Sequence, residues 1–223
     1  MSDGSLKRAA LVVFDLDGTL VDSKKDLAAA VNSVLTSYGT PALPEWQVGR
    51  MVGDGAAALV ARAFEAAKIE ARADALERFL RFYDACLLDH TRPYDGIESM
   101  LDALKGRVAL ALLTNKPRAA TQRILDELGL ARFFTPDLTV CGDGPYPRKP
   151  DPAGLLALAA AAGVSPGQVL MVGDSLVDRR TASAAGVMSC VATYGFGFEA
   201  FPMDELGDLA ILIDSPASLA GLL

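Results

Sequence analysis

The sequence predicts an α/β fold, with a parallel sheet covered by helices on both faces and an inserted α-helical domain. Short, continuously apolar runs, typical of buried parallel strands, recur along the chain with helical patterns between most of them. Residues 24–91 break this alternation because they are almost wholly helical. We therefore expect a core of residues 1–21 and 93–223, and an α-helical cap domain of residues 22–92.

The apolar runs predict the strands of the core in order along the chain. They lie at residues 9–14, 108–113, 138–141, 169–172, 187–192 and 210–213. Apolar periodicity predicts core helices at 97–105, 117–128, 152–162 and 179–185, and cap helices at 24–38, 56–67 and 71–88. Helix boundaries are indicated by prolines placed for a first turn and by glycines after helix ends: Pro117, Pro152, Gly106, Gly129, Gly163 and Gly186.

Composition limits the classes of function. The 223 residues are 51% hydrophobic, which allows one large domain or one domain with a modest insertion. The net charge of −7 argues against binding to nucleic acid, because phosphate backbones require a basic surface. A small anionic substrate is still compatible, since a metal ion and a few cations can reverse the sign of the charge within a cleft.

Other sequence features point to a cytoplasmic protein. The polar residues 1–7 contain no signal segment, and no apolar stretch reaches the roughly 18 residues of a membrane span. The three cysteines are widely spaced without a CxxC pair, which argues against disulfides or a zinc site. His90, the single histidine, is expected to be structural or on the surface. Nothing in the sequence indicates an oligomeric state.

The acidic sequence Asp15-Leu16-Asp17-Gly18-Thr19 directly follows the first apolar run. The run ends at the edge of the predicted sheet where open α/β folds bind ligands. Alternation along a strand places Asp15 and Asp17 on one side, and Gly18 allows close approach of the backbone to a ligand. Taken alone the pattern also fits a solvated turn. Alternatively, two nearby carboxylates can bind a hard cation such as Mg²⁺, and they can serve as a nucleophile and as a proton carrier.

Three further polar segments follow at strand ends or helix starts. Thr114 and Asn115 would form an anion cradle with helix N–H groups, or serve as ordinary helix caps. Lys149 precedes a predicted helix and suits a phosphoryl oxygen, although a single lysine also fits a solvated surface. Asp174 follows another strand and suits a Mg²⁺ site, while Asp178 would hold a metal-bound water or brace Lys149.

In this order, the four segments resemble the four motifs of the haloacid dehalogenase superfamily, over residues 9–192. The helical insert resembles the cap that phosphatases of this superfamily add to a Rossmann-like core. Among them the chain is most similar to bacterial phosphoglycolate phosphatases, at residues 18–23, 26–28, 52–55 with 59–60, and 148–152. Two departures are Asp54, where the resemblance implies Asn, and the pair Arg179-Arg180, in place of small or apolar residues.

The resemblance implies a Mg²⁺-dependent phosphomonoester hydrolase. It makes Asp15 the nucleophile that forms an aspartyl-phosphate, and Asp17 the group that protonates the leaving alkoxide and then deprotonates water. The metal ligands would be the Asp15 carboxylate, the Asp17 backbone carbonyl and Asp174. Thr114, Asn115 and Lys149 would contact the phosphoryl group, and Ser175 and Asp178 would support the site. The other predicted substrate contacts are Gly18, Arg50, Gly53, Asp54 and Gly55.

Asp17 separates phosphoryl transfer from related reactions. Dehalogenases and phosphonate-cleaving relatives lack this second aspartate, and the latter add a Schiff-base lysine in the cap. A sugar-phosphate mutase shares the aspartate pair, but we find no His-Lys pair in the predicted cap to retain an intermediate. A non-catalytic binding module is a further alternative, which the presence of all four core motifs disfavours.

The substrate is expected to be a small phosphorylated metabolite. The resemblance favours 2-phosphoglycolate, hydrolysed to glycolate and phosphate. The helix start at residues 55–57, with Arg50 or Arg62, would receive its carboxylate, although either arginine also fits a solvated surface. Sugar phosphates, nucleotides and pyridoxal phosphate are the alternatives.

Overall fold

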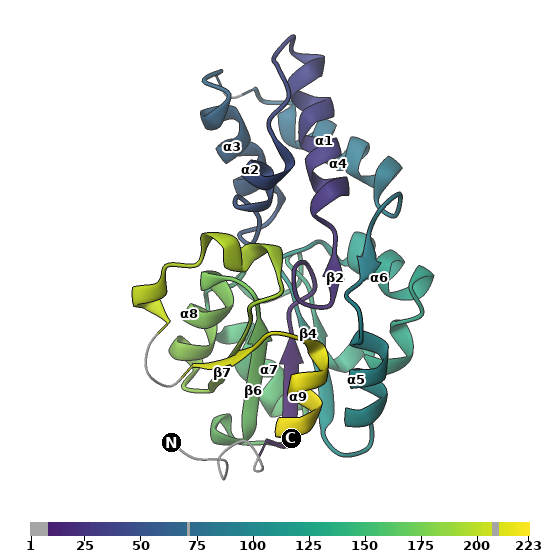
Figure 1. Ribbon diagram of the computed structural model, residues 1–223, viewed down its shortest axis with the longest axis vertical. Helices are drawn as coiled ribbons and strands as arrows, with labels where there is room; N and C mark the ends of the chain where they lie inside the picture. The colour runs from purple at the N-terminus through teal and green to yellow at the C-terminus, as the bar shows by residue number, and fades with distance from the viewer. Residues whose placement is uncertain (1–8, 71, 207–209) are drawn as a thin grey trace.

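The computed structural model describes residues 9–70, 72–206 and 210–223, and a six-stranded sheet forms its centre (Figure 1). The strand order is β5-β4-β1-β6-β7-β8, and every neighbouring pair is parallel. The predicted α/β class is therefore confirmed. The strands are β1 (Leu11–Phe14), β4 (Ala109–Leu113), β5 (Thr139–Val140), β6 (Val169–Gly173), β7 (Met188–Ala192) and β8 (Ile211–Ile213).

Helices cover both faces of the sheet, which explains why its central strands are apolar throughout. Val12 and Phe14 of β1 pack into one hydrophobic core, while Leu11 and Val13 pack into the other. The first core includes α5 (Ile97–Leu104), α6 (Arg118–Glu127) and α9 (Pro216–Leu222), and the second includes α7 (Ala153–Ala161) and α8 (Leu176–Ala185).

A block of helices lies beyond the carboxyl end of the sheet (Figure 1). It is connected to the sheet through an antiparallel ribbon of β2 (Val21–Asp22) and β3 (Arg92–Pro93). The ribbon brings the two chain crossings side by side, so the chain enters and leaves the block at one narrow junction. The helical block consists of α1 (Lys24–Ser37), α2 (Glu45–Gly49), α3 (Ala56–Ala66) and α4 (Ala75–Cys86).

Asp26 fastens this junction. Its fully buried carboxylate, in the first turn of α1, accepts the backbone N–H of His90 at 2.9 Å. It also accepts the N–H and the hydroxyl of Thr91, each at 2.7 Å. Burial tends to raise the pKa of Asp26, but these hydrogen bonds outweigh burial and hold the pKa below its ordinary value. His90 also lies 2.9 Å from Asp26 through its ring Nδ1 and is exposed, which fits the expectation of a structural or surface residue.

Several predicted boundaries require correction. Helix α4 starts at Ala75, with Asp74 at its N-cap, and the predicted start, Ala71, lies outside the described residues. Helix α8 starts three residues before its predicted start, at Leu176, because Ser175 and Asp178 form a capping box. The predicted strand at 138–141 is shortened to its two central residues. Two prolines predicted in first turns occupy N-caps instead: Pro117 and Pro152.

Among the strands and α-helices of the described residues, four short ones were not predicted: β2, β3, α2 and α9. All four glycines expected after helices adopt the positive φ of helix ends. Gly106, Gly129 and Gly163 each lie one residue beyond a C-cap, and Gly186 is itself the C-cap of α8. Within the described residues, no helix combines the length and apolar character needed to span a membrane. Residues 1–7, where we expect no signal segment, lie outside the described part of the chain.

Candidate active site

A cavity of about 290 Å³ lies between the carboxyl edge of the sheet and the helical block. On the sheet side, the cavity is lined by Asp15 and Asp17, the two aspartates of the first motif. This agrees with the prediction that both lie on one side of the strand end. The other motif residues that line it are Thr114, Asn115, Asp174 and Ser175. Three of the four predicted motifs therefore meet in one cavity, although they are far apart in the sequence.

The deepest part of the site is a cluster of carboxylates. Oxygen atoms of Asp15, Asp174 and Asp178 all lie within 4.8 Å of one another, and the three residues are buried. Burial raises the pKa of Asp15 to about 7, with the Asp178 carboxylate acting in the same direction and Lys149 opposing it. Burial and then the two neighbouring carboxylates also hold the pKa of Asp174 well above its ordinary value. The cluster therefore holds too little positive charge to balance its three carboxylates.

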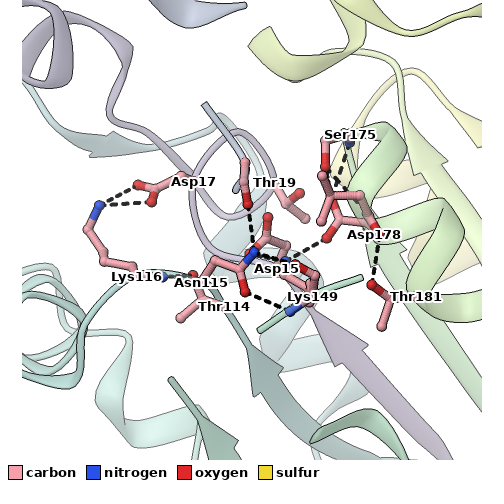
Figure 2. Close-up of polar contacts among 12 residues, drawn as sticks. Asp15, Asp17, Thr19, Thr114, Asn115, Lys116, Lys149, Ser175, Asp178 and Thr181 are labelled. Carbon is pink, nitrogen blue, oxygen red and sulfur yellow. Dashed lines mark hydrogen bonds and ion pairs between the residues drawn. The ribbon is translucent and has the colours of Figure 1, made fainter. Parts of the chain in front are cut away.

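Lys149 supplies part of that charge (Figure 2). Its ammonium lies 2.8 Å from an Asp15 oxygen and 2.6 Å from an Asp178 oxygen. Asp178 thus braces Lys149, one of the two roles that the sequence left open. Burial alone would lower the pKa of Lys149, but the two carboxylates outweigh burial and hold it above its ordinary value. Lys149 does not itself line the cavity.

Asn115 fixes the backbone of the lysine loop. Its side-chain carbonyl accepts the Lys149 N–H at 2.8 Å, and its amide nitrogen donates to the Lys149 carbonyl at 2.9 Å. The same amide nitrogen donates to the Gly53 carbonyl at 2.8 Å, which connects the sheet side to the helical block. On the opposite side, Ser175 donates its hydroxyl to Asp178 at 2.6 Å. Asn115 therefore holds Lys149 directly, and Ser175 supports it through Asp178.

Gly18 supports the cluster by leaving room for it. Its φ of +84° lies in the left-handed region, and a Cβ at this position would overlap the Asp174 carboxylate. Gly18 does not line the cavity. Asp174 is further fixed by the Gly197 N–H, which donates to its Oδ2 at 2.7 Å. The close approach of Gly18 thus serves the carboxylate cluster, not direct contact with a substrate.

The residues present fit a divalent metal ion. Four carboxylates (Asp15, Asp17, Asp174 and Asp178) face two lysine ammonium groups (Lys116 and Lys149), which leaves an excess of two negative charges. Oxygen donors of this kind suit hard cations. A bound cation would oppose both the burial and the carboxylate repulsion that raise the pKa values of Asp15 and Asp174. Asp15 and Asp174 are the cluster carboxylates that also line the cavity.

Lys116 is a residue of the site to which the sequence assigned no role. Its ammonium lies 2.8 and 2.9 Å from the two Asp17 carboxylate oxygens and 2.8 Å from the hydroxyl of Tyr83 on α4. Figure 2 shows Asp17 turned toward Lys116 and away from the Asp15 cluster. Burial would lower the pKa of Lys116, but the Asp17 carboxylate outweighs it and holds the pKa above its ordinary value. The only sequence signal was its position, two residues after Thr114.

The substrate contacts predicted in the helical block divide into two groups. Gly53 and Gly55 line the cavity, whereas Arg50 and Asp54 do not. The Asp54 carboxylate is instead paired with Arg62, which also donates to a backbone carbonyl. The Arg50 guanidinium stacks over the Trp46 ring at 5.2 Å. The structure therefore does not place Arg50, Asp54 or Arg62 where they would contact a substrate in this cavity.

Known proteins resemble this chain over most of its length. Residues 9–186 match the model of the haloacid dehalogenase-like hydrolases. A phosphoglycolate phosphatase from Rhodospirillum rubrum is 44% identical over 212 residues, which cover 91% of this chain and 86% of the relative. Phosphoglycolate phosphatase 1 of Pseudomonas aeruginosa is 40% identical, covering 94% and 81%.

The fold agrees with these sequence matches. A crystal structure described as a predicted phosphoglycolate phosphatase from Haemophilus somnus superposes with a TM-score of 0.86 at 32% identity. The match covers 96% of this chain and 98% of the other. The family match and the relatives at about 40% identity agree with the four motifs and the carboxylate cluster. The chain belongs to the haloacid dehalogenase-like hydrolase family.

Proposed function

We propose that the protein is a Mg²⁺-dependent phosphomonoester hydrolase that acts through an aspartyl-phosphate on Asp15, with 2-phosphoglycolate as its substrate. One observation carries the chemistry: the buried Asp15 carboxylate lies at the cavity wall, 2.8 Å from the Lys149 ammonium and within 4.8 Å of the Asp174 and Asp178 oxygens. The relatives named phosphoglycolate phosphatase, at about 40% identity over most of the chain, support the substrate.

Asp15 and Asp17 divide the reaction into two displacements. In the first, an Asp15 oxygen bonds to phosphorus, the ester bond breaks, and Asp17 gives a proton to the departing oxygen. In the second, Asp17 takes a proton from water, whose oxygen bonds to phosphorus and releases Asp15 with inorganic phosphate. Both aspartates line the same cavity, as this division requires.

The remaining motif residues hold charge and geometry. Lys149 offsets the charge of Asp15 and of the phosphoryl oxygens, while Asn115 and Asp178 fix its position. Thr114 lies at the cavity wall, where its hydroxyl suits a phosphoryl oxygen. Asp15, the Asp17 carbonyl and Asp174 would hold Mg²⁺, which when bound supplies positive charge to the phosphoryl oxygens.

We further propose that residues 22–92 are a cap on a core of residues 1–21 and 93–223. The narrow β2–β3 junction and the cavity between the two parts support this division. Movement of the cap about the junction would admit the substrate and then exclude water. We also propose a cytoplasmic location, which agrees with the free cysteines Cys86, Cys141 and Cys190.

The cavity wall supports a compact substrate. The helical block contributes mainly apolar side chains, among them Leu27, Leu59 and Phe79. Of the described residues in this part of the wall, only Tyr83 and Asp84 carry polar side chains. A sugar phosphate or nucleotide would leave most of its hydroxyl groups without partners there, which costs binding energy. This wall therefore favours phosphoglycolate over those alternatives.

Phosphate release with Mg²⁺ across a panel of phosphomonoesters tests the proposal, with Asp15→Asn as the matched variant. We expect turnover of 2-phosphoglycolate well above that of sugar phosphates, nucleotides and pyridoxal phosphate, and no turnover by the variant. Broad, weak turnover that the variant abolishes would refute the substrate alone. Activity that persists in Asp15→Asn would refute the mechanism.

A further inference from the structure

We propose that Lys116 recognises a carboxylate on the leaving-group side of the substrate. This inference rests on the proposed function and names the substrate class: small phosphomonoesters whose carboxylate carbon lies two bonds from the ester oxygen. Lys116 would exchange its bond to Asp17 for a bond to that carboxylate. The cavity would then select acidic leaving groups without any arginine from the helical block.

The first argument is the distribution of charge around the cavity. Among the described residues that line it, Lys116 is the only basic one. Lys149 is absent from this wall, and its ammonium is bonded to Asp15 and Asp178. Arg62 is paired with Asp54 outside the cavity wall. A carboxylate that enters beside a phosphoryl group therefore has one ammonium group available to it.

The second argument is reach. In the proposed reaction, the Asp17 carboxylate forms a hydrogen bond to the ester oxygen. The Lys116 ammonium lies 2.8 and 2.9 Å from the same carboxylate. The ester oxygen and the ammonium are thus each one hydrogen bond, about 2.8 Å, from Asp17. Two hydrogen bonds end to end span about 6 Å at most, and a carboxylate two bonds beyond the ester oxygen, with its own hydrogen bond to Lys116, can cover that span.

The third argument is the balance of hydrogen bonds at Lys116. An ammonium group has three N–H donors, and here the acceptors are the two Asp17 oxygens and the Tyr83 hydroxyl. The Lys116 side chain is only 4% exposed, so loss of Asp17 would leave a buried charge without its counter-ion. A substrate carboxylate supplies a new counter-ion to Lys116, which leaves Asp17 able to turn to the ester oxygen of a substrate. Tyr83 meanwhile holds the ammonium in place from α4.

Isothermal titration calorimetry with Mg²⁺ tests this inference using two phosphonates that cannot be hydrolysed. In 3-phosphonopropionate a methylene replaces the ester oxygen of phosphoglycolate, and in propylphosphonate a methyl group also replaces the carboxylate. We expect the wild-type protein to bind the first about 10- to 100-fold more tightly, as a charge-assisted hydrogen bond provides. In Lys116→Met that preference should fall to less than about 3-fold.

The matched control is Lys25→Met, which removes the same charge from an exposed site in α1 and should keep the full preference. If Lys116→Met does not fold, Lys116→Gln replaces it, because Gln keeps a donor for Asp17 and Tyr83 without the charge. Equal binding of both phosphonates by the wild type would overturn the inference, and so would a preference that survives in the Lys116 variant. Neither result depends on turnover, so a failure of the proposed function would be seen separately, in the phosphate-release panel.

Discussion

Removal of the Asp26 carboxylate should destabilise the protein more than any single exposed substitution. Asp26→Ala leaves the N–H and the hydroxyl of Thr91 without their acceptor, and Thr91 is fully buried. Each buried donor left unsatisfied costs about 1–3 kcal/mol, so we expect a loss of roughly 2–6 kcal/mol. His90 adds little to this sum, because its exposed position allows water to replace the lost bond.

Urea unfolding followed by circular dichroism and by fluorescence measures this loss. Trp46 is the single tryptophan and lies in α2, so its fluorescence reports on the helical block, while circular dichroism reports on all helices. Asp26→Asn keeps one acceptor oxygen and should lose about half as much. The control is Asp95→Ala at an exposed position near the same junction, expected to change stability by less than about 0.5 kcal/mol. A loss below about 1 kcal/mol in Asp26→Ala would refute the role of Asp26 in fastening the junction.

Three further outcomes follow from the charges. The pKa of Asp26 is lowered in the folded protein, so the stabilisation by its carboxylate is present above the ordinary pKa and is lost as the pH falls through the folded-state pKa. On acidification from pH 5 to 3, the free energy of unfolding should therefore fall more in the wild-type protein than in Asp26→Asn. The pKa of Asp15 is raised to about 7, so in EDTA its contribution to stability falls as the pH rises from about 4 to 7, and Asp15→Asn should show a smaller fall in melting temperature over that interval. Mg²⁺ should raise the melting temperature more at pH 8 than at pH 5, and Asp174→Asn should remove most of that rise.

The parts of the site that could be predicted from the sequence lie at the ends of strands. The buried run of β1 determines where Asp15 leaves the sheet, and β6 does the same for Asp174. Asp178 was expected near Asp174 from its place one helical turn later, although the capping box with Ser175 that holds it in the first turn of α8 was missed. These positions depend on local patterns that a single segment of sequence contains.

The contacts that were missed join segments that are distant in the sequence. Lys116 meets Tyr83 only because α4 folds over the sheet edge, 33 positions away along the chain. The β2–β3 ribbon has only two residues in each strand, too few for any periodic signal. The charge of Arg62 is visible in the sequence, but its pairing with Asp54 is not, and that pairing occupies the arginine outside the cavity wall.

The central claim is that Asp15 becomes phosphorylated, and trapping that ester tests it most directly. Asp17→Asn should slow hydrolysis of the ester, while p-nitrophenyl phosphate, whose leaving group needs no proton, still allows it to form. Acid quenching within one turnover, borohydride reduction and peptide mass spectrometry should then show Asp15 converted to homoserine. An unmodified Asp15 in protein that has released p-nitrophenol, or modification of a different residue, would contradict the account.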